Sequence, residues 1–170
     1  IQYPWLLDKG GVRFFGQPDP IRRNYLNADF ADDVAGRVSK SVHIQVGAVA
    51  EDEVRETAFA QSCSTGTAGR FPSAAVVAID LGQPDIQHKL KLQLDFDLTR
   101  GVRHIIGKSA EENPSLPVVV PEVWINNWKL LVEHDLSFDL KLTEDQYEVV
   151  LAALSKVPGM KVSICHFASP

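Results

Sequence analysis

Short apolar runs alternate along the chain with longer amphipathic stretches. The apolar, β-branched runs predict strands, at residues 42–46, 74–80, 102–106, 137–142 and 162–166. The amphipathic stretches predict helices, at residues 27–36, 51–62, 85–96, 121–135 and 143–159. From residue 42 onward strand and helix alternate strictly, and this order predicts an α/β fold with parallel strands joined by helical crossovers.

Two architectures fit this alternation, a doubly wound open sheet and a (β/α) barrel. The run "AAVVAI" is apolar at every position, which is typical of strands that are covered on both faces. No GxGxxG follows a predicted strand, and no GxxxxGK[ST] is present, so the nucleotide-binding form of the open sheet is disfavoured. We expect residues 1–170 to form a single domain.

Each predicted strand carries a polar residue close to its carboxyl end, namely Gln45, Asp80, Arg103, Asp139 and His166. In parallel α/β folds the functional groups gather at these ends. Burying an unpaired charge costs several kcal/mol, so this recurrence predicts a shared polar cavity at one end of the sheet.

Structural roles are the alternatives for the same residues. His166 is also compatible with a core histidine bonded to a backbone carbonyl, and Asp80 with a cap for the following loop. Asp139 has Lys141 as a candidate ion-pair partner, and His43 fits a packed structural role. Trp124 and Trp128, spaced i and i+4, are expected to pack their helix against the strands, and His88 and His134 are expected on the surface.

Composition narrows the function classes. The net charge of -5 argues against a nucleic-acid-binding surface, and no apolar run is long enough to span a membrane. The first residues lack the basic start and apolar core of a signal peptide. Cys63 and Cys165 are too few for a disulfide scaffold. We therefore expect a cytoplasmic protein that binds a small molecule.

Several segments, taken in order, resemble the amidohydrolase superfamily. They are "YPWL", "IRRNYLNADFADDVAG", "KSVHIQVG", "VVAIDL", "RGVRHIIG", "LSFDLKL" and "ICHFASP". More narrowly, they are similar to its branch of lactonase-like, metal-dependent hydrolases. The resemblance implies a (β/α)8 TIM barrel. Members of this branch also have a His-x-His strand before the "YPWL" segment and an Asp on the last strand, and neither is present here. We therefore expect the central part of a barrel, with about five of its strand–helix units.

The resemblance also implies roles for residues. His166 falls on the strand-end histidine, which is a metal ligand in metal-dependent members and a polar site group in others. Asp139 is expected to act with it in catalysis, and Arg103 to hold a substrate carboxylate. Gln45 and Asp80 are expected to complete the substrate site. The cofactor is one divalent ion, Zn or Mn, or none.

The implied reaction is hydrolysis of a lactone or related cyclic ester that bears a carboxylate or hydroxyls. We expect the complete protein to be active and this segment alone to be inactive. Two alternatives stay open, a metal-dependent decarboxylase or other lyase of the same superfamily, and a truncated, non-catalytic binding module. Because an open part-barrel exposes two strand edges, a homo-oligomer is also compatible with the sequence.

Overall fold

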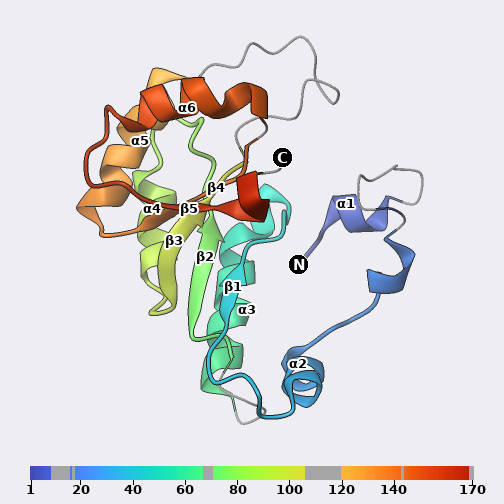
Figure 1. Cartoon of the computed structure of the whole chain (residues 1–170). Coiled ribbons are helices and arrows are strands. Elements are labelled where there is room, and N and C mark those ends of the chain that lie inside the picture. The colour runs from blue at the N-terminus through green and yellow to red at the C-terminus, as the bar shows by residue number, and fades with distance from the viewer. Residues whose placement is uncertain (9–15, 17, 67–70, 106–119, 143, 169–170) are drawn as a thin grey trace.

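The computed structural model describes residues 1–8, 16, 18–66, 71–105, 120–142 and 144–168. Its centre is a five-stranded sheet in which all neighbouring strands are parallel (Figure 1). The spatial order of the strands is their order in the sequence, β1-β2-β3-β4-β5, without the reversal that a doubly wound sheet shows. The prediction of an α/β fold with a parallel sheet is thus confirmed. The strands are β1 Val42–Ile44, β2 Ala74–Ala78, β3 Thr99–Arg103, β4 Ser137–Leu140 and β5 Lys161–Ile164.

Helices fill the connections between consecutive strands. They are α3 Glu53–Thr65, α4 Gln87–Leu94, α5 Glu122–Glu133 and α6 Tyr147–Leu154, preceded by α1 Pro4–Leu7 and α2 Asn27–Val34. Helix α2 begins where the Asp29 carboxylate accepts the Leu26 N–H at 2.7 Å, and it ends where Ala35 and Gly36 adopt positive φ. Single 3-10 turns occur at Asp19–Ile21, Ala50–Asp52, Glu144–Gln146 and Cys165–Ala168. Thr143, where the last helix was predicted to begin, lies outside the described residues.

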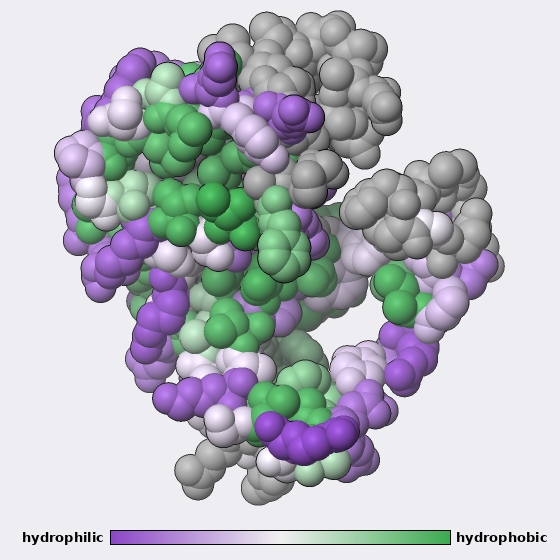
Figure 2. Space-filling view, viewed as in Figure 1, coloured by the Kyte–Doolittle hydropathy of each residue, from purple (hydrophilic) through white to green (hydrophobic). Residues whose placement is uncertain are grey.

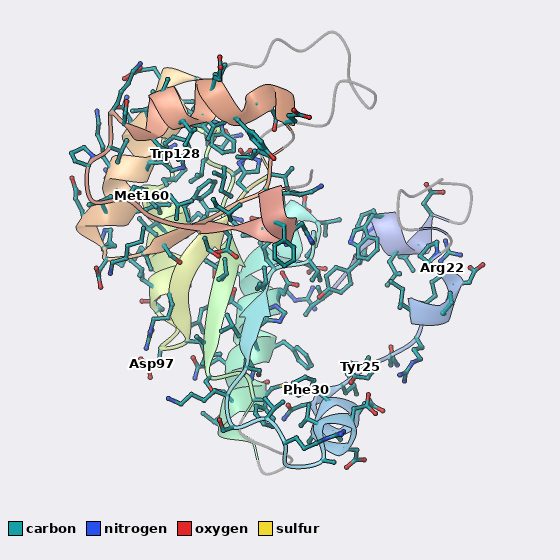
Figure 3. The ribbon with its side chains drawn as sticks, in the orientation of Figure 1. Arg22, Tyr25, Phe30, Asp97, Trp128 and Met160 are labelled. Carbon is teal, nitrogen blue, oxygen red and sulfur yellow. The ribbon has the colours of Figure 1, made fainter. Side chains whose placement is uncertain are left out.

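The hydrophobic core lies between helices α3 to α6 and one face of the sheet. Alternate strand residues supply that face, with Ala75, Val77, Ile79, Val102, Phe138 and Leu140. Trp128 is fully buried, and its ring centroid lies 5.5 Å from that of Phe138. Trp124 meets both rings edge-on. Figure 3 shows Trp128 inside the packed region beneath α6. The expected packing of the two tryptophans against the strands is confirmed.

The opposite face of the sheet is different in character, and we call it the polar face. Register partners place these residues side by side on it: Gly101 with Ser137, and Arg103 with Asp139 and Ser163. In a parallel sheet such partners point to the same side. On this face β2 is apolar, through Val76 and Ala78, which are buried outside the main core cluster. Strand β1 is apolar here too, through Val42 and Ile44, the register partners of Ala74 and Val76. The interpretation of "AAVVAI" as a strand covered on both faces is confirmed, since consecutive residues of β2, from Ala75 to Ala78, are all buried.

All five strands differ from their predicted ranges, and β1 and β4 each end two residues early, at Ile44 and Leu140. Strand β3 begins at Thr99 rather than Val102, because the ladder with Ala75 already starts there; Ile106 lies outside the described residues. Strand β2 ends at Ala78, which leaves Asp80 in the following turn. Strand β5 ends at Ile164, so that His166 lies in the turn beyond it, where His166 and Phe167 have left-handed backbone angles. The apolar composition predicted that these strands exist, but it did not predict the residues at which their hydrogen-bonded ladders end.

The N-terminal segment runs beside the sheet and packs against the carboxyl end of β1 (Figure 1). The Trp5 indole N–H donates to the Val46 carbonyl at 2.6 Å, and the Arg22 Nε donates to the Leu6 carbonyl at 2.7 Å. Farther along, Phe30 of α2 meets Phe71 edge-on at 5.2 Å; Figure 3 labels Arg22, Tyr25 and Phe30 in this segment. In the described part of the chain, every helix is too short or too polar to cross a bilayer.

Candidate functional site

Arg103 and Asp139 form the centre of the candidate site. Arg103 is the last residue of β3, and Asp139 is its register partner on β4. Both therefore lie on the polar face close to the carboxyl ends of the strands. Local sequence explains this placement, since each polar residue alternates with an apolar neighbour, Val102 or Phe138, that is fully buried in the core.

The Arg103 side chain offers an unused hydrogen-bond donor. Its Nε is buried and has no hydrogen-bond partner among the described residues. A buried donor without a partner costs about 1–3 kcal/mol, and such atoms in native structures call for an explanation. A ligand oxygen, above all that of a carboxylate, has the geometry and charge to accept from a guanidinium.

Asp139 is a buried carboxyl group with an altered acidity. It is 4% exposed, and burial raises its pKa, while the positive charge of Arg103 acts in the opposite direction. A carboxyl whose pKa is raised is better suited to accept and return a proton than an ordinary surface aspartate. Asp139 therefore has the character of a general base or acid.

Cys165 lies against Asp139. Its Sγ is 4.0 Å from Asp139 Oδ2, so the thiol donates a weak hydrogen bond to the carboxylate. Burial raises the pKa of this thiol, the Arg103 charge lowers it and Asp139 raises it, with a net upward shift. A thiol with a raised pKa is a poor nucleophile at neutral pH.

Gln45 follows β1 and reaches the same end of the sheet. Its Nε2 donates to the Arg103 carbonyl at 3.4 Å, although β2 lies between the two strands, and its Oε1 accepts the Gly47 N–H at 2.7 Å. The residue is 8% exposed. Both ends of its amide thus bond to the backbone. Gln45 therefore stabilises the backbone around Arg103, and its amide groups are already used in these bonds.

Asp80 lies in the turn after β2 and caps it. Its Oδ1 accepts the Gly82 N–H at 2.9 Å and its Oδ2 accepts from the Gln83 side chain at 2.8 Å. Burial acts to raise the pKa of Asp80, but these hydrogen bonds and the nearby His104 lower it overall. The alternative role as a loop cap is therefore what the structure shows, and His104 at 3.6 Å is its neighbour.

A second polar cluster, which the sequence did not reveal, is centred on Glu56 of α3. Glu56 is 2% exposed, and its Oε1 accepts from the Tyr3 hydroxyl at 3.1 Å and from the Val46 N–H at 3.4 Å. His43 Nε2 lies 3.6 Å from the same oxygen. His43 Nε2 makes no hydrogen bond among the described residues, and its place beside core residue Ala75 in the β1–β2 ladder fits the packed structural role expected for it. Burial, followed by the charge of Glu56, raises the pKa of Tyr3.

His166 lies beyond the end of β5, with a positive φ of 51° and an exposed side chain. The sequence placed it with the other strand-end groups, but the structure brings together only Arg103, Asp139 and, through its amide, Gln45. Among the described residues no three His, Cys, Asp or Glu side chains gather closely enough to hold a metal ion. The described donor set therefore does not fit a zinc or manganese site, which needs about three protein ligands.

Comparison with known proteins finds a similar protein, but one whose activity is not described. No family model matches the chain, and no solved structure matches it. The chain is 30% identical over 172 residues to y4mH, an uncharacterized protein of Sinorhizobium fredii (strain NBRC 101917 / NGR234), a match that covers 96% of this chain and 56% of the relative. The chain thus spans about half the length of the curated relative that it matches.

Proposed function

We propose that this chain contributes the central strands of a (β/α)8 barrel, and that the complete protein is a lactonase-like hydrolase of the amidohydrolase superfamily. Two features support the barrel. The five parallel strands are in sequential order, and the core cluster places α3 to α6 on one face of the sheet, as in a barrel whose helices all lie outside.

The sheet edges also favour a larger assembly. β1 and β5 are the outer strands, and they carry exposed aliphatic side chains, with Val42, Ile44, Val162 and Ile164 each at least 37% exposed. Figure 2 shows apolar side chains on the side of the molecule from which β1 and β5 are seen in Figure 1. Exposed apolar edge strands are pairing surfaces. We propose that further strands of the same protein cover them, with a second copy of the chain as the alternative.

The placement of Arg103 and Asp139 as register partners on the polar face is the observation that carries the proposed chemistry. Arg103 binds a carboxylate of the substrate and fixes the orientation of its lactone ring. Asp139 accepts a proton from a water molecule as the water oxygen bonds to the lactone carbonyl carbon. The ring C–O bond then breaks, and the departing oxygen takes up the proton, which leaves a hydroxy acid.

A divalent ion, where one is bound, supplies Lewis-acid activation of the carbonyl and a more acidic water. His166 is the described residue that the resemblance assigns to such an ion. Because the described residues do not form a ligand set, no step above depends on one. The decarboxylase alternative would use the same end of the barrel.

The test uses the full-length reading frame that encodes this chain. Purified protein is assayed on carboxylate-bearing pyrone lactones and on sugar lactones, with and without added zinc or manganese. We expect ring opening, and Asp139→Asn should lower kcat by roughly 10²- to 10⁴-fold. Asp97→Asn is the matched control, since Asp97 is exposed before the amino end of β3, whereas Arg103 lies at the carboxyl end; Figure 3 labels Asp97. Absence of turnover on every lactone would favour the lyase or the non-catalytic alternative.

A further inference from the structure

The loop that joins β2 to α4, residues 79–86, is held from two sides. From α5, the buried Asn127 donates its side-chain N–H groups to the Leu81 carbonyl at 2.9 Å and to the Gln83 carbonyl at 2.8 Å. From the end of β3, His104 Nδ1 accepts the Leu81 N–H at 3.0 Å. Leu81 itself is fully buried, so both bonds fix the loop at its point of entry into the core.

The His104 contact defines the protonation state of the ring. Because Nδ1 accepts a hydrogen bond from a backbone N–H, it carries no proton, and the ring is neutral with its hydrogen on Nε2. The ring stacks on Trp124 of α5 at a centroid distance of 4.5 Å and an angle of 17°. Stacking holds the ring plane, and Asp80 Oδ1 lies 3.6 Å from the same Nδ1 atom.

We propose that His104 is a pH-sensitive latch that holds the β2–α4 loop when neutral and releases the Leu81 N–H when protonated. A proton taken from solvent bonds to the Nδ1 lone pair that now accepts the Leu81 hydrogen bond. Two N–H groups cannot share that position, so the Leu81 bond breaks. The new N–H donates instead to Asp80 Oδ1, and a neutral hydrogen bond is exchanged for an ion pair.

The surroundings set the pH at which this exchange occurs. Burial lowers the pKa of His104, while Asp80 from the loop and Glu53 from α3 raise it, with a net downward shift. The charge of Lys89 of α4 lowers the pKa of Asp80. Trp124 of α5, which stacks on the ring, carries no charge. The latch is therefore closed at neutral pH and opens below the ordinary histidine value of about 6.5.

Opening the latch would alter the strand-end face of the sheet. Asp80 now accepts from Gly82 and Gln83 within the turn, and pairing with a charged imidazole competes with these bonds. A single protonation thus removes the Leu81 bond to His104 and weakens the bonds of Asp80 within the turn. The hydrogen bonds from Asn127 to the loop remain. This inference does not depend on the proposed lactone chemistry.

The experiment is a pH titration followed by NMR of the backbone amides and the histidine rings, from pH 8 to pH 5, on the intact chain. We expect the Leu81 amide to shift with the same midpoint as the His104 ring. Its hydrogen-exchange protection, corrected for intrinsic rates, should fall roughly fivefold to tenfold as the bond is lost.

Two variants make the result specific. His104→Gln keeps an acceptor for Leu81 but cannot be protonated, so the Leu81 titration should disappear. His88→Gln, which removes an exposed histidine of α4, should leave the titration unchanged. If His104→Gln does not fold, Asp80→Asn serves instead, and we expect it to lower the His104 midpoint further. A Leu81 amide that stays constant while His104 titrates would overturn the proposal, as would a Leu81 titration that persists in His104→Gln.

Discussion

Arg103 and Asp139 are register partners on neighbouring parallel strands, and their charges interact, yet no ion pair joins them in the described part of the chain. A buried carboxylate ordinarily takes its nearest cation as a direct partner. Among the described residues the Arg103 Nε has no acceptor, and the Asp139 carboxyl has a weak thiol donor as its hydrogen-bond partner. Such an arrangement is costly for folding and suited to a ligand that inserts between the two groups.

Replacing Asp139 with Asn tests how much the buried carboxylate lowers the stability of the folded protein. Its pKa is raised in the folded protein by burial, so the folded state holds this proton more tightly than the unfolded chain does. Stability from this group is therefore present at low pH and is lost as the pH rises from about 3.9 through the folded value. We expect Asp139→Asn to flatten this decline and to raise the free energy of unfolding at pH 7 by on the order of 1 kcal/mol.

Urea unfolding at several pH values measures this effect. Asp97→Asn, which changes an exposed aspartate, is the control and should leave the pH profile unaltered. A loss of stability at pH 7 in Asp139→Asn would mean that the carboxylate is a structural partner of Arg103 rather than a poised site group.

The sequence predicted the strands and the buried face of the sheet well, because both follow from the spacing of apolar residues such as Val77, Val102 and Phe138. The sequential strand order was expected from the resemblance to barrel proteins, since the apolar spacing alone fits two architectures. It also placed Arg103 and Asp139 late on their strands. It could not predict that Gln45 would bond to backbone at both ends, since a side-chain amide carries no sign of its partners. The Glu56 cluster was missed for a related reason. In sequence Glu56 is one more acidic residue in a polar helix, and only packing against β1 and Tyr3 buries it.

Gly101 lies where β3 and β4 approach closely. A Cβ at this position would overlap Ser137 Oγ and would lie 3.0 Å from the Ser137 carbonyl oxygen. We expect Gly101→Ala to destabilise the protein by about 1–3 kcal/mol, measured by urea unfolding. Because the hydroxyl is the closest obstacle, adding Ser137→Ala should recover part of this loss. Gly66→Ala is the control, since its nearest contacts are ordinary at 3.4 Å. No recovery in the double variant would place the clash on the backbone instead.

Trp128 should dominate the stability of the core. It is fully buried between α5 and the sheet and packs on Phe138. We expect Trp128→Ala to cost about 3–5 kcal/mol in the free energy of unfolding. Trp128→Phe should cost distinctly less, because it keeps most of the ring and removes an indole N–H that is buried without a partner in the part of the chain that the structure describes. Leu151→Ala on the exposed side of α6 is the control, with an expected effect within about 0.5 kcal/mol. Equal losses for the alanine and phenylalanine variants would contradict this account.

Tyr3 ties the N-terminal segment to the rest of the fold through Glu56. Its hydroxyl donates to Glu56 Oε1 at 3.1 Å, and Glu56 is 2% exposed. Removing the donor in Tyr3→Phe leaves a buried carboxylate oxygen with one fewer partner, which should cost about 1–3 kcal/mol.

Limited proteolysis measures how firmly residues 1–8 are held against the rest of the fold. Because Tyr3 lies next to the Trp5 contact with Val46, we expect faster cleavage within residues 1–8 of Tyr3→Phe, while the sheet remains resistant. Tyr25→Phe is the matched control, since the Tyr25 hydroxyl bonds to Asp33 at the surface, and its loss should change cleavage of residues 1–8 much less. Glu56→Gln should accelerate cleavage as Tyr3→Phe does, and the double variant should add little to either single change, because both remove the same interaction. Additive effects in the double variant would show that Tyr3 and Glu56 stabilise the segment independently.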